Sequence, residues 1–176
     1  TIGTGTGDTD RLGFSGEANG RLLLVGTDAE NVTNKRGWAT INGGTFDNNG
    51  RISKTKPNTT GDGAIAYVHP QGSLSVNGGE FNGNYVSAGA NGVTRSGGAV
   101  IHSQGNVSVN GGTFDGNTTQ ANSKNNPGFH GGGAIWSDGT LTINNGTFTN
   151  NVSNAQHFMP GYDEDKCSDA EVEMAI

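Results

Sequence analysis

Apolar and polar residues alternate in four short segments of the chain that share one pattern. The segments are residues 39–49, 74–84, 107–117 and 141–151. Each begins with alternating apolar and polar residues, passes through a turn that contains glycine, and ends with Phe-x-x-Asn. Alternation with a period of two is typical of β-strands that bury one face. The apolar spacing of an amphipathic helix is absent, and the frequent Gly and Asn residues also disfavour helices.

The segments recur at a nearly constant distance along the chain. The phenylalanines that close them are Phe46, Phe81, Phe114 and Phe148. By residue number they are 35, 33 and 34 positions apart, and Phe14 lies 32 positions before the first. A Gly-Ala-Ile or Gly-Ala-Val motif begins at Gly63, Gly98 and Gly133, at a spacing of 35. A fixed period of this length indicates stacked supersecondary units.

Each unit is predicted to contain a strand, a glycine turn, a second strand, another turn, a short strand and a loop. One unit cannot bury its apolar side chains alone, but stacked copies bury them in a continuous column. The predicted fold is therefore all-β: a right-handed parallel β-helix of four to five coils. Right-handed winding is predicted because parallel crossover connections almost always turn that way. The predicted inward column comprises Ile41, Val76, Val109, Ile143 and the phenylalanines.

Two further columns follow from the same alignment. Asn49, Asn84, Asn117 and Asn151 are predicted to stack, so that their amides form a structural ladder along the axis. Outward hydroxyls are predicted at Thr40, Ser75, Ser108 and Thr142, with asparagines beside them at positions 42, 77, 110 and 144. Such a regular face is one requirement for binding ice, although exposed β faces in general carry these residue types.

The loops that connect successive units are long and are predicted to lie along one edge of the helix. They are residues 50–60, 85–96 and 118–130. Loops of this length are often functional, and these contain five of the ten Lys and Arg residues of the chain. The candidate ligand-binding residues are therefore Arg51, Lys54, Lys56, Arg95 and Lys124. A simple solvated edge is the alternative interpretation.

A single β-helix domain is predicted over residues 1–160. Residues 1–20 form its cap or a degenerate first coil, residues 21–25 a buried strand, and residues 161–176 an acidic C-terminal cap or tail. The net charge of −6 lies almost entirely after residue 155, where six acidic residues and one lysine occur. A nucleic-acid-binding protein normally has a basic body, so that class is disfavoured. No apolar run approaches the roughly 20 residues that span a bilayer.

The paired motifs resemble a known repeat. Residues 62–65, 97–100 and 132–135, together with Phe-x-x-Asn, are similar to the repeat of chlamydial polymorphic outer membrane proteins. The resemblance implies a right-handed β-helix, extracellular or cell-surface display, and often adhesion. The partners that it suggests are a glycan, another cell-surface component or further copies of the chain.

No catalytic residue, metal site or cofactor is predicted, and the chain is expected to be a non-catalytic, adhesin-like or structural surface module. A polysaccharide-active β-helix enzyme is one alternative. Asp47 and Asp115 share a column with Asn82 between them, and a separation of about 9.6 Å would loosely suit an inverting pair of carboxylates. The repeat pattern is also compatible with an ice-binding protein and with a subunit of an extracellular filament.

Overall fold

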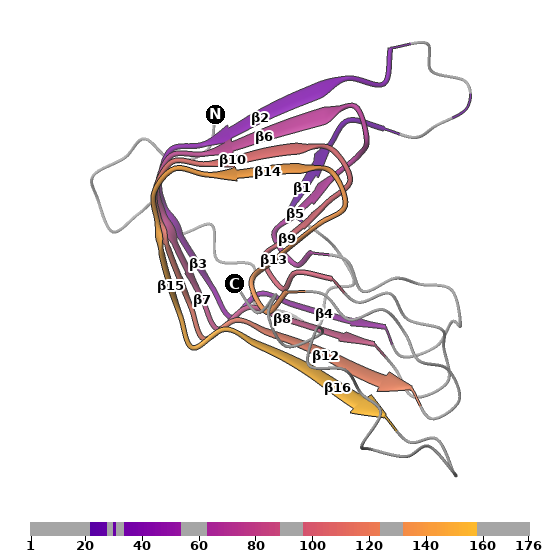
Figure 1. Cartoon of the computed structure of the whole chain (residues 1–176), viewed down its shortest axis with the longest axis vertical. Helices are drawn as coiled ribbons and strands as arrows, with labels where there is room; N and C mark the ends of the chain where they lie inside the picture. The colour runs from indigo at the N-terminus through magenta and orange to yellow at the C-terminus, as the bar shows by residue number, and fades with distance from the viewer. Residues whose placement is uncertain are drawn as a thin grey trace.

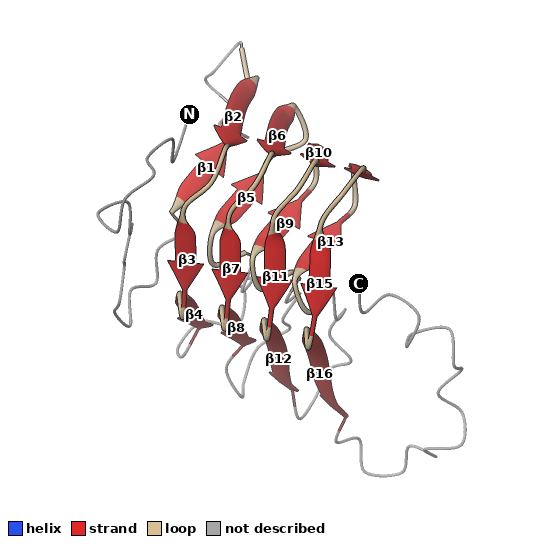
Figure 2. Cartoon of the chain, turned by 90° about the vertical axis from the view of Figure 1, so that its left-hand side faces the viewer, coloured by secondary structure: helices blue, strands red, loops and turns tan. Residues whose placement is uncertain are grey.

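The protein is a right-handed parallel β-helix of four coils (Figures 1 and 2). In this computed structural model the described residues are 22–27, 30, 34–53, 63–88, 97–123 and 132–157. Each coil contributes one strand to each of four sheets, in the order B, A, C and D along the chain. No helix occurs among the described residues. The predicted all-β fold and the predicted handedness are confirmed.

Each sheet contains four parallel strands. Sheet B contains β1 (Leu23–Val25), β5 (Ala66–Val68), β9 (Ile101–Ser103) and β13 (Ile135–Ser137). Sheet A contains β2 (Gly37–Ile41), β6 (Gly72–Val76), β10 (Asn106–Val109) and β14 (Thr140–Ile143). Sheet C contains β3 (Thr45–Asp47), β7 (Glu80–Asn82), β11 (Thr113–Asp115) and β15 (Thr147–Thr149). Sheet D contains β4 (Gly50–Ser53), β8 (Tyr85–Ala88), β12 (Thr118–Ser123) and β16 (Val152–His157).

The strands pair so that like residues of successive coils lie in register. In sheet C the phenylalanines pair with one another, and neighbouring rings stack with centroids 4.6 to 4.9 Å apart. In sheet A, Ile41 pairs with Val76, which in turn pairs with Val109. These three side chains of sheet A are fully buried, as the alternating sequence pattern predicts. A thin column of stacked side chains therefore serves as the core.

The corner between sheets C and D depends on a second column. The residue before each stacked asparagine has a positive φ, between 53° and 61°, which glycine and asparagine tolerate best. The four residues in this conformation are Asn48, Gly83, Gly116 and Asn150. The asparagine that follows then turns its amide into the helix interior. This geometry explains the Asn-Asn and Gly-Asn pairs that end each repeat.

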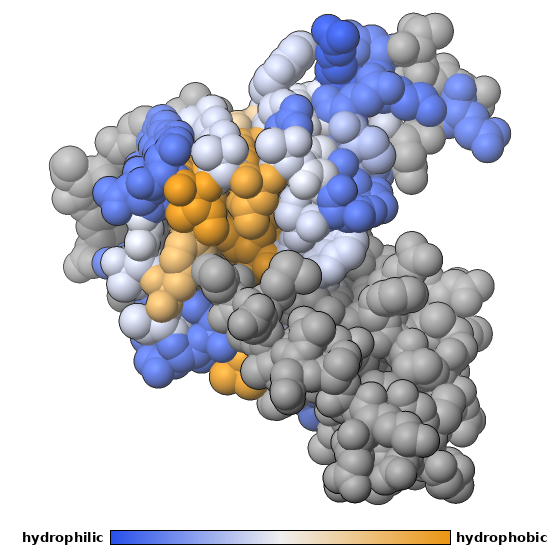
Figure 3. Space-filling view, viewed as in Figure 1, coloured by the Kyte–Doolittle hydropathy of each residue, from blue (hydrophilic) through white to orange (hydrophobic). Residues whose placement is uncertain are grey.

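The structure differs from the predictions in three places. Sheet D is predicted as the start of the long loops, but those residues continue the helix as a fourth strand in each coil. The strand over residues 21–25 is only partly buried, because Leu24 points outward and is 56% exposed. Ile143 occupies the inward column but is 43% exposed, because it belongs to the last described coil. Figure 3 shows a hydrophobic patch at this end of the helix.

Candidate functional site

Of the residues of the predicted cationic edge, only Arg51 lies among the described residues. The backbone of Arg51 lies in β4 and pairs with Val86, whose side chain is fully buried in β8. The other four candidates, Lys54, Lys56, Arg95 and Lys124, lie outside the described residues, as do residues 1–20 and 161–176. Loop binding therefore stays a prediction.

The two aspartates considered for catalysis lie where the sequence alignment puts them. Asp47 and Asp115 both pair with Asn82, on opposite sides of it. Asp115 accepts hydrogen bonds from Thr149 Oγ1 at 2.6 Å and from Asn150 Nδ2 at 2.9 Å. These bonds lower the pKa of Asp115, with the bond from Thr149 contributing most. A general acid needs a raised pKa, so Asp115, which stays ionised, is not suited to that role.

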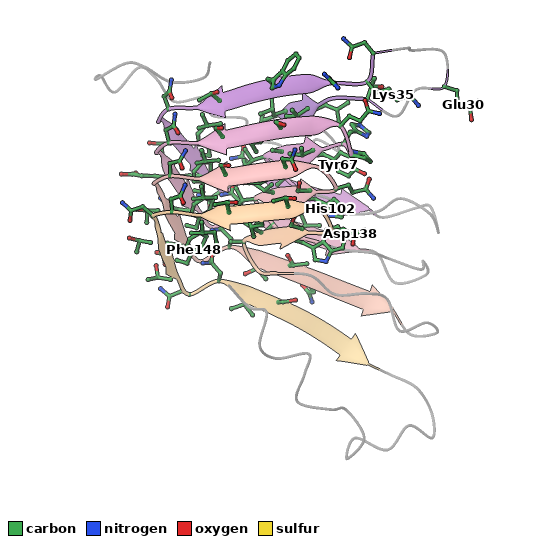
Figure 4. All side chains as sticks on the ribbon, turned by 45° about the horizontal axis from the view of Figure 1, so that its top comes forward. Glu30, Lys35, Tyr67, His102, Asp138 and Phe148 are labelled. Carbon is green, nitrogen blue, oxygen red and sulfur yellow. The ribbon has the colours of Figure 1, made fainter. Side chains whose placement is uncertain are left out.

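The outer face of sheet A carries three straight columns of mostly polar residues. The first column is Trp38, Ser73, Asn106 and Thr140. The second is Thr40, Ser75, Ser108 and Thr142. The third, at the corner with sheet C, is Asn42, Asn77, Asn110 and Asn144. None of these residues is charged, and all are exposed or partly exposed. The strands that carry them run side by side and nearly parallel (Figure 4).

The third column is held by hydrogen bonds between its own side chains. Asn77 Nδ2 donates to Asn42 Oδ1 at 2.8 Å, and the same bond repeats from coil to coil at 2.9 and 2.7 Å. Such ladders hold amides at fixed positions and favour a flat sheet. Each Nδ2 has two hydrogens and uses only one of them in the ladder. The column therefore presents fixed donors and acceptors to solvent at about the 4.8 Å spacing of the strands.

Trp38 stands out on this face because its side chain is 75% exposed. It is the most exposed large hydrophobic residue among those described. Large aromatic side chains are usually at least partly buried, and tryptophan is enriched where proteins contact their partners. The polar columns follow Trp38 along one continuous surface. We therefore take the outer face of sheet A, defined by the three columns, as the candidate binding face.

A second outward feature, on sheet B, does not follow from the sequence alignment. Tyr67, His102 and Trp136 pair in register and their rings stack, with centroid distances of 5.0 and 4.2 Å. Tyr67 Oη also donates to Gln104 Oε1 at 2.7 Å. Figure 4 shows Tyr67 and His102 at the same end of successive coils. His102 is only 4% exposed, and the rings of Tyr67 and Trp136 stack on its imidazole. The stack therefore stabilises sheet B and leaves the imidazole of His102 inaccessible to a ligand.

The alignment misses this stack because of a shift of one residue. The Gly-Ala motifs align at a spacing of 35, which would place Ser137 opposite His102. In the structure Ile101 pairs with Ile135, a spacing of 34, so Trp136 lies opposite His102. A shift of one residue exchanges the two faces of a strand. The spacing of 34 between Phe114 and Phe148 is the signal that gives the correct register.

The comparisons with known proteins give no further assignment. The chain matches no family profile, no curated protein and no solved structure. Within the described ranges, no three His, Cys, Asp or Glu side chains lie close enough together to hold a metal ion. The same part of the chain has no helix long and apolar enough to cross a membrane.

Proposed function

We propose that this chain is a non-catalytic, extracellular, adhesin-like surface module that contacts its partner through the binding face of sheet A. The proposal rests mainly on that face, a rigid array of uncharged polar groups with an exposed tryptophan at one end. Binding to a repetitive partner is favoured by a repetitive surface, because each coil repeats the same contact. The similarity of the paired motifs to chlamydial polymorphic outer membrane proteins supports display at a cell surface.

Substitution at the centre of the binding face tests this proposal. Ser108 lies in the middle column, with its neighbours Ser75 and Thr142 on either side. Ser108→Glu introduces a charge and a longer side chain there, and is expected to abolish the binding of labelled protein to intact cells. The matched control is Thr113→Glu on sheet C, where the paired residue Glu80 shows that the column accepts glutamate. Equal binding by the two variants would exclude this face as the contact surface.

Ice binding is a second candidate function, favoured by the middle column of the same face. Thr40, Ser75, Ser108 and Thr142 lie in register across all four strands. Thermal hysteresis of the purified protein, compared with that of Thr142→Tyr, tests this function directly. Hysteresis that disappears in the variant would support ice binding in place of adhesion.

A further inference from the structure

We infer that the ligand of the binding face is a neutral polysaccharide, which lies along the helix axis with one sugar ring stacked on Trp38. This inference rests on the proposed function and adds the chemical class of the ligand. Its three supports are the exposure of Trp38, the lack of charge on the face, and the hydrogen-bonding groups beside the indole ring.

The exposed indole favours a ligand with an apolar face. Trp38 pairs with Ser73 in the next coil, a residue too small to cover a ring of that size. At 75% exposure the indole is available to a partner. A pyranose ring has one face lined by C–H groups, and an aromatic ring with a negative π face attracts such groups. The edge of the same sugar carries hydroxyls, which require polar partners close to the ring.

The residues beside Trp38 supply those polar partners. Ser73, Asn106 and Thr140 continue its column, and each can both donate and accept a hydrogen bond. The hydroxyl column lies about 6.6 Å away, two residues further along each strand. A chain of sugars along the axis therefore meets a donor or acceptor in every coil. Because no charged residue lies in the three columns, a neutral chain leaves no charge unpaired when it binds.

The position of Trp38 also distinguishes a polysaccharide from ice. An ice plane needs a surface without protrusions, whereas an indole exposed to this extent projects above the serines and threonines of the same sheet. The amide ladder at the corner also offers strong donors directed at solvent. Both features suit a hydroxyl-rich molecule that contacts the face at separate points.

The test measures binding of the whole chain to defined polysaccharides by isothermal titration calorimetry. The probes are a soluble neutral glucan and a soluble neutral mannan, with polygalacturonate and heparin as anionic counterparts. The decisive variant is Trp38→Ala, and its matched control is Leu24→Ala, which removes another exposed apolar side chain (56% exposed) from the same coil. Both side chains are largely in solvent, so neither variant is expected to unfold the protein.

The expected result is binding of at least one neutral polysaccharide that weakens about ten-fold or more in Trp38→Ala, as for aromatic hot spots. Leu24→Ala should bind like the parent protein. Binding should also be nearly independent of salt, since no charges are paired. Unchanged affinity in Trp38→Ala would overturn the inference. So would preferential, salt-sensitive binding of the anionic polymers, in which case Arg36, just before β2, becomes the first residue to test.

The same experiment separates this inference from the proposed function. If no neutral polysaccharide binds while cell binding persists and is lost in Ser108→Glu, the ligand class is wrong and the adhesive face stands. If cell binding is the same in Ser108→Glu and Thr113→Glu, the proposed face itself is wrong, and the inference is overturned with it. Thermal hysteresis without polysaccharide binding would overturn the inference in favour of ice.

Discussion

Two asparagine ladders run the length of this helix, and they differ in burial and in the number of hydrogen bonds between successive coils. The exposed ladder at the corner of sheets A and C makes one side-chain hydrogen bond between each pair of coils. The buried ladder at the corner of sheets C and D makes two, because each accepting Oδ1 bonds both the backbone N–H and the Nδ2 of the preceding asparagine. Asn84, Asn117 and Asn151 also donate to a phenylalanine carbonyl in sheet C.

The difference shows that repetition alone does not identify a functional column. A buried amide must satisfy its donors and acceptors inside the protein, so the buried ladder uses its hydrogen-bonding capacity to hold the corner. An exposed amide can exchange its bonds with water at little cost. The exposed ladder therefore keeps donors and acceptors for a partner. We therefore expect substitutions in the buried ladder to reduce mainly stability, and substitutions in the exposed ladder to reduce mainly binding.

The largest expected effect follows removal of a central amide from the buried ladder. Asn117 is fully buried and its side chain takes part in four hydrogen bonds, two to Asn84, one to Phe81 and one to Asn151. Asn117→Ala leaves buried donors and a carbonyl without partners, and each such group costs about 1–3 kcal/mol. We expect a loss of about 3 kcal/mol in the free energy of unfolding, measured by urea denaturation. A loss below about 0.5 kcal/mol would contradict the structural role of this ladder.

A smaller loss is expected at the first asparagine of the same ladder. Asn49 Oδ1 is buried and accepts no hydrogen bond from any described residue. Asn49→Ala removes this unsatisfied acceptor along with the bonds from Nδ2 to Asn84 and, at 3.4 Å, to the carbonyl of Asp47. The backbone N–H of residue 49 can still donate to Asn84. The expected loss is therefore about 1 kcal/mol in the same urea assay. A loss equal to that of Asn117→Ala would show that a group outside the described residues donates to Asn49.

Much of this fold could be predicted from the sequence because the columns repeat identical or similar residues. Phe46 and Phe81 stack, and Ile41 and Val76 pair, as the alignment of their segments requires. The exposed hydroxyl and amide columns of sheet A are predicted for the same reason. A side chain that recurs at a fixed period in a stacked unit meets its own copy in the next coil. The spacing of the repeats therefore determines the register in these sheets.

Sheet D could not be predicted because the column through Val86 repeats no residue type. Val86 pairs with Arg51 on one side and with Thr119 on the other, and of these three residues only Val86 is apolar. Thr119 is buried, and its hydroxyl is satisfied by donating to the carbonyl of Gly132 at 3.1 Å, a partner 13 positions further along the chain. No local pattern indicates such a bond. The strand forms because its backbone continues the pairing of the coil, whatever its side chains are.

The binding face is only partly visible in the sequence for a related reason. Its three columns are recognisable, but Trp38 has no aromatic counterpart at its position in the next three coils and so belongs to no repeat. Its importance depends on exposure, which is known only once the strand direction is fixed. In stacked proteins of this kind, a residue that breaks a repeat on an outer face is therefore the first candidate for a binding residue.

The smallest expected effect on stability, and the sharpest contrast with Asn117, is at Asn110 in the exposed ladder. Its side chain bonds to Asn77 and Asn144, and water can replace both partners. Asn110→Ala should change the free energy of unfolding by less than about 0.5 kcal/mol in the urea assay. Polysaccharide binding should nevertheless weaken, because fixed amide contacts are lost in the third column of the face. If stability fell as far as in Asn117→Ala while binding stayed intact, the exposed ladder would be structural too, and the functional distinction between the two columns would fail.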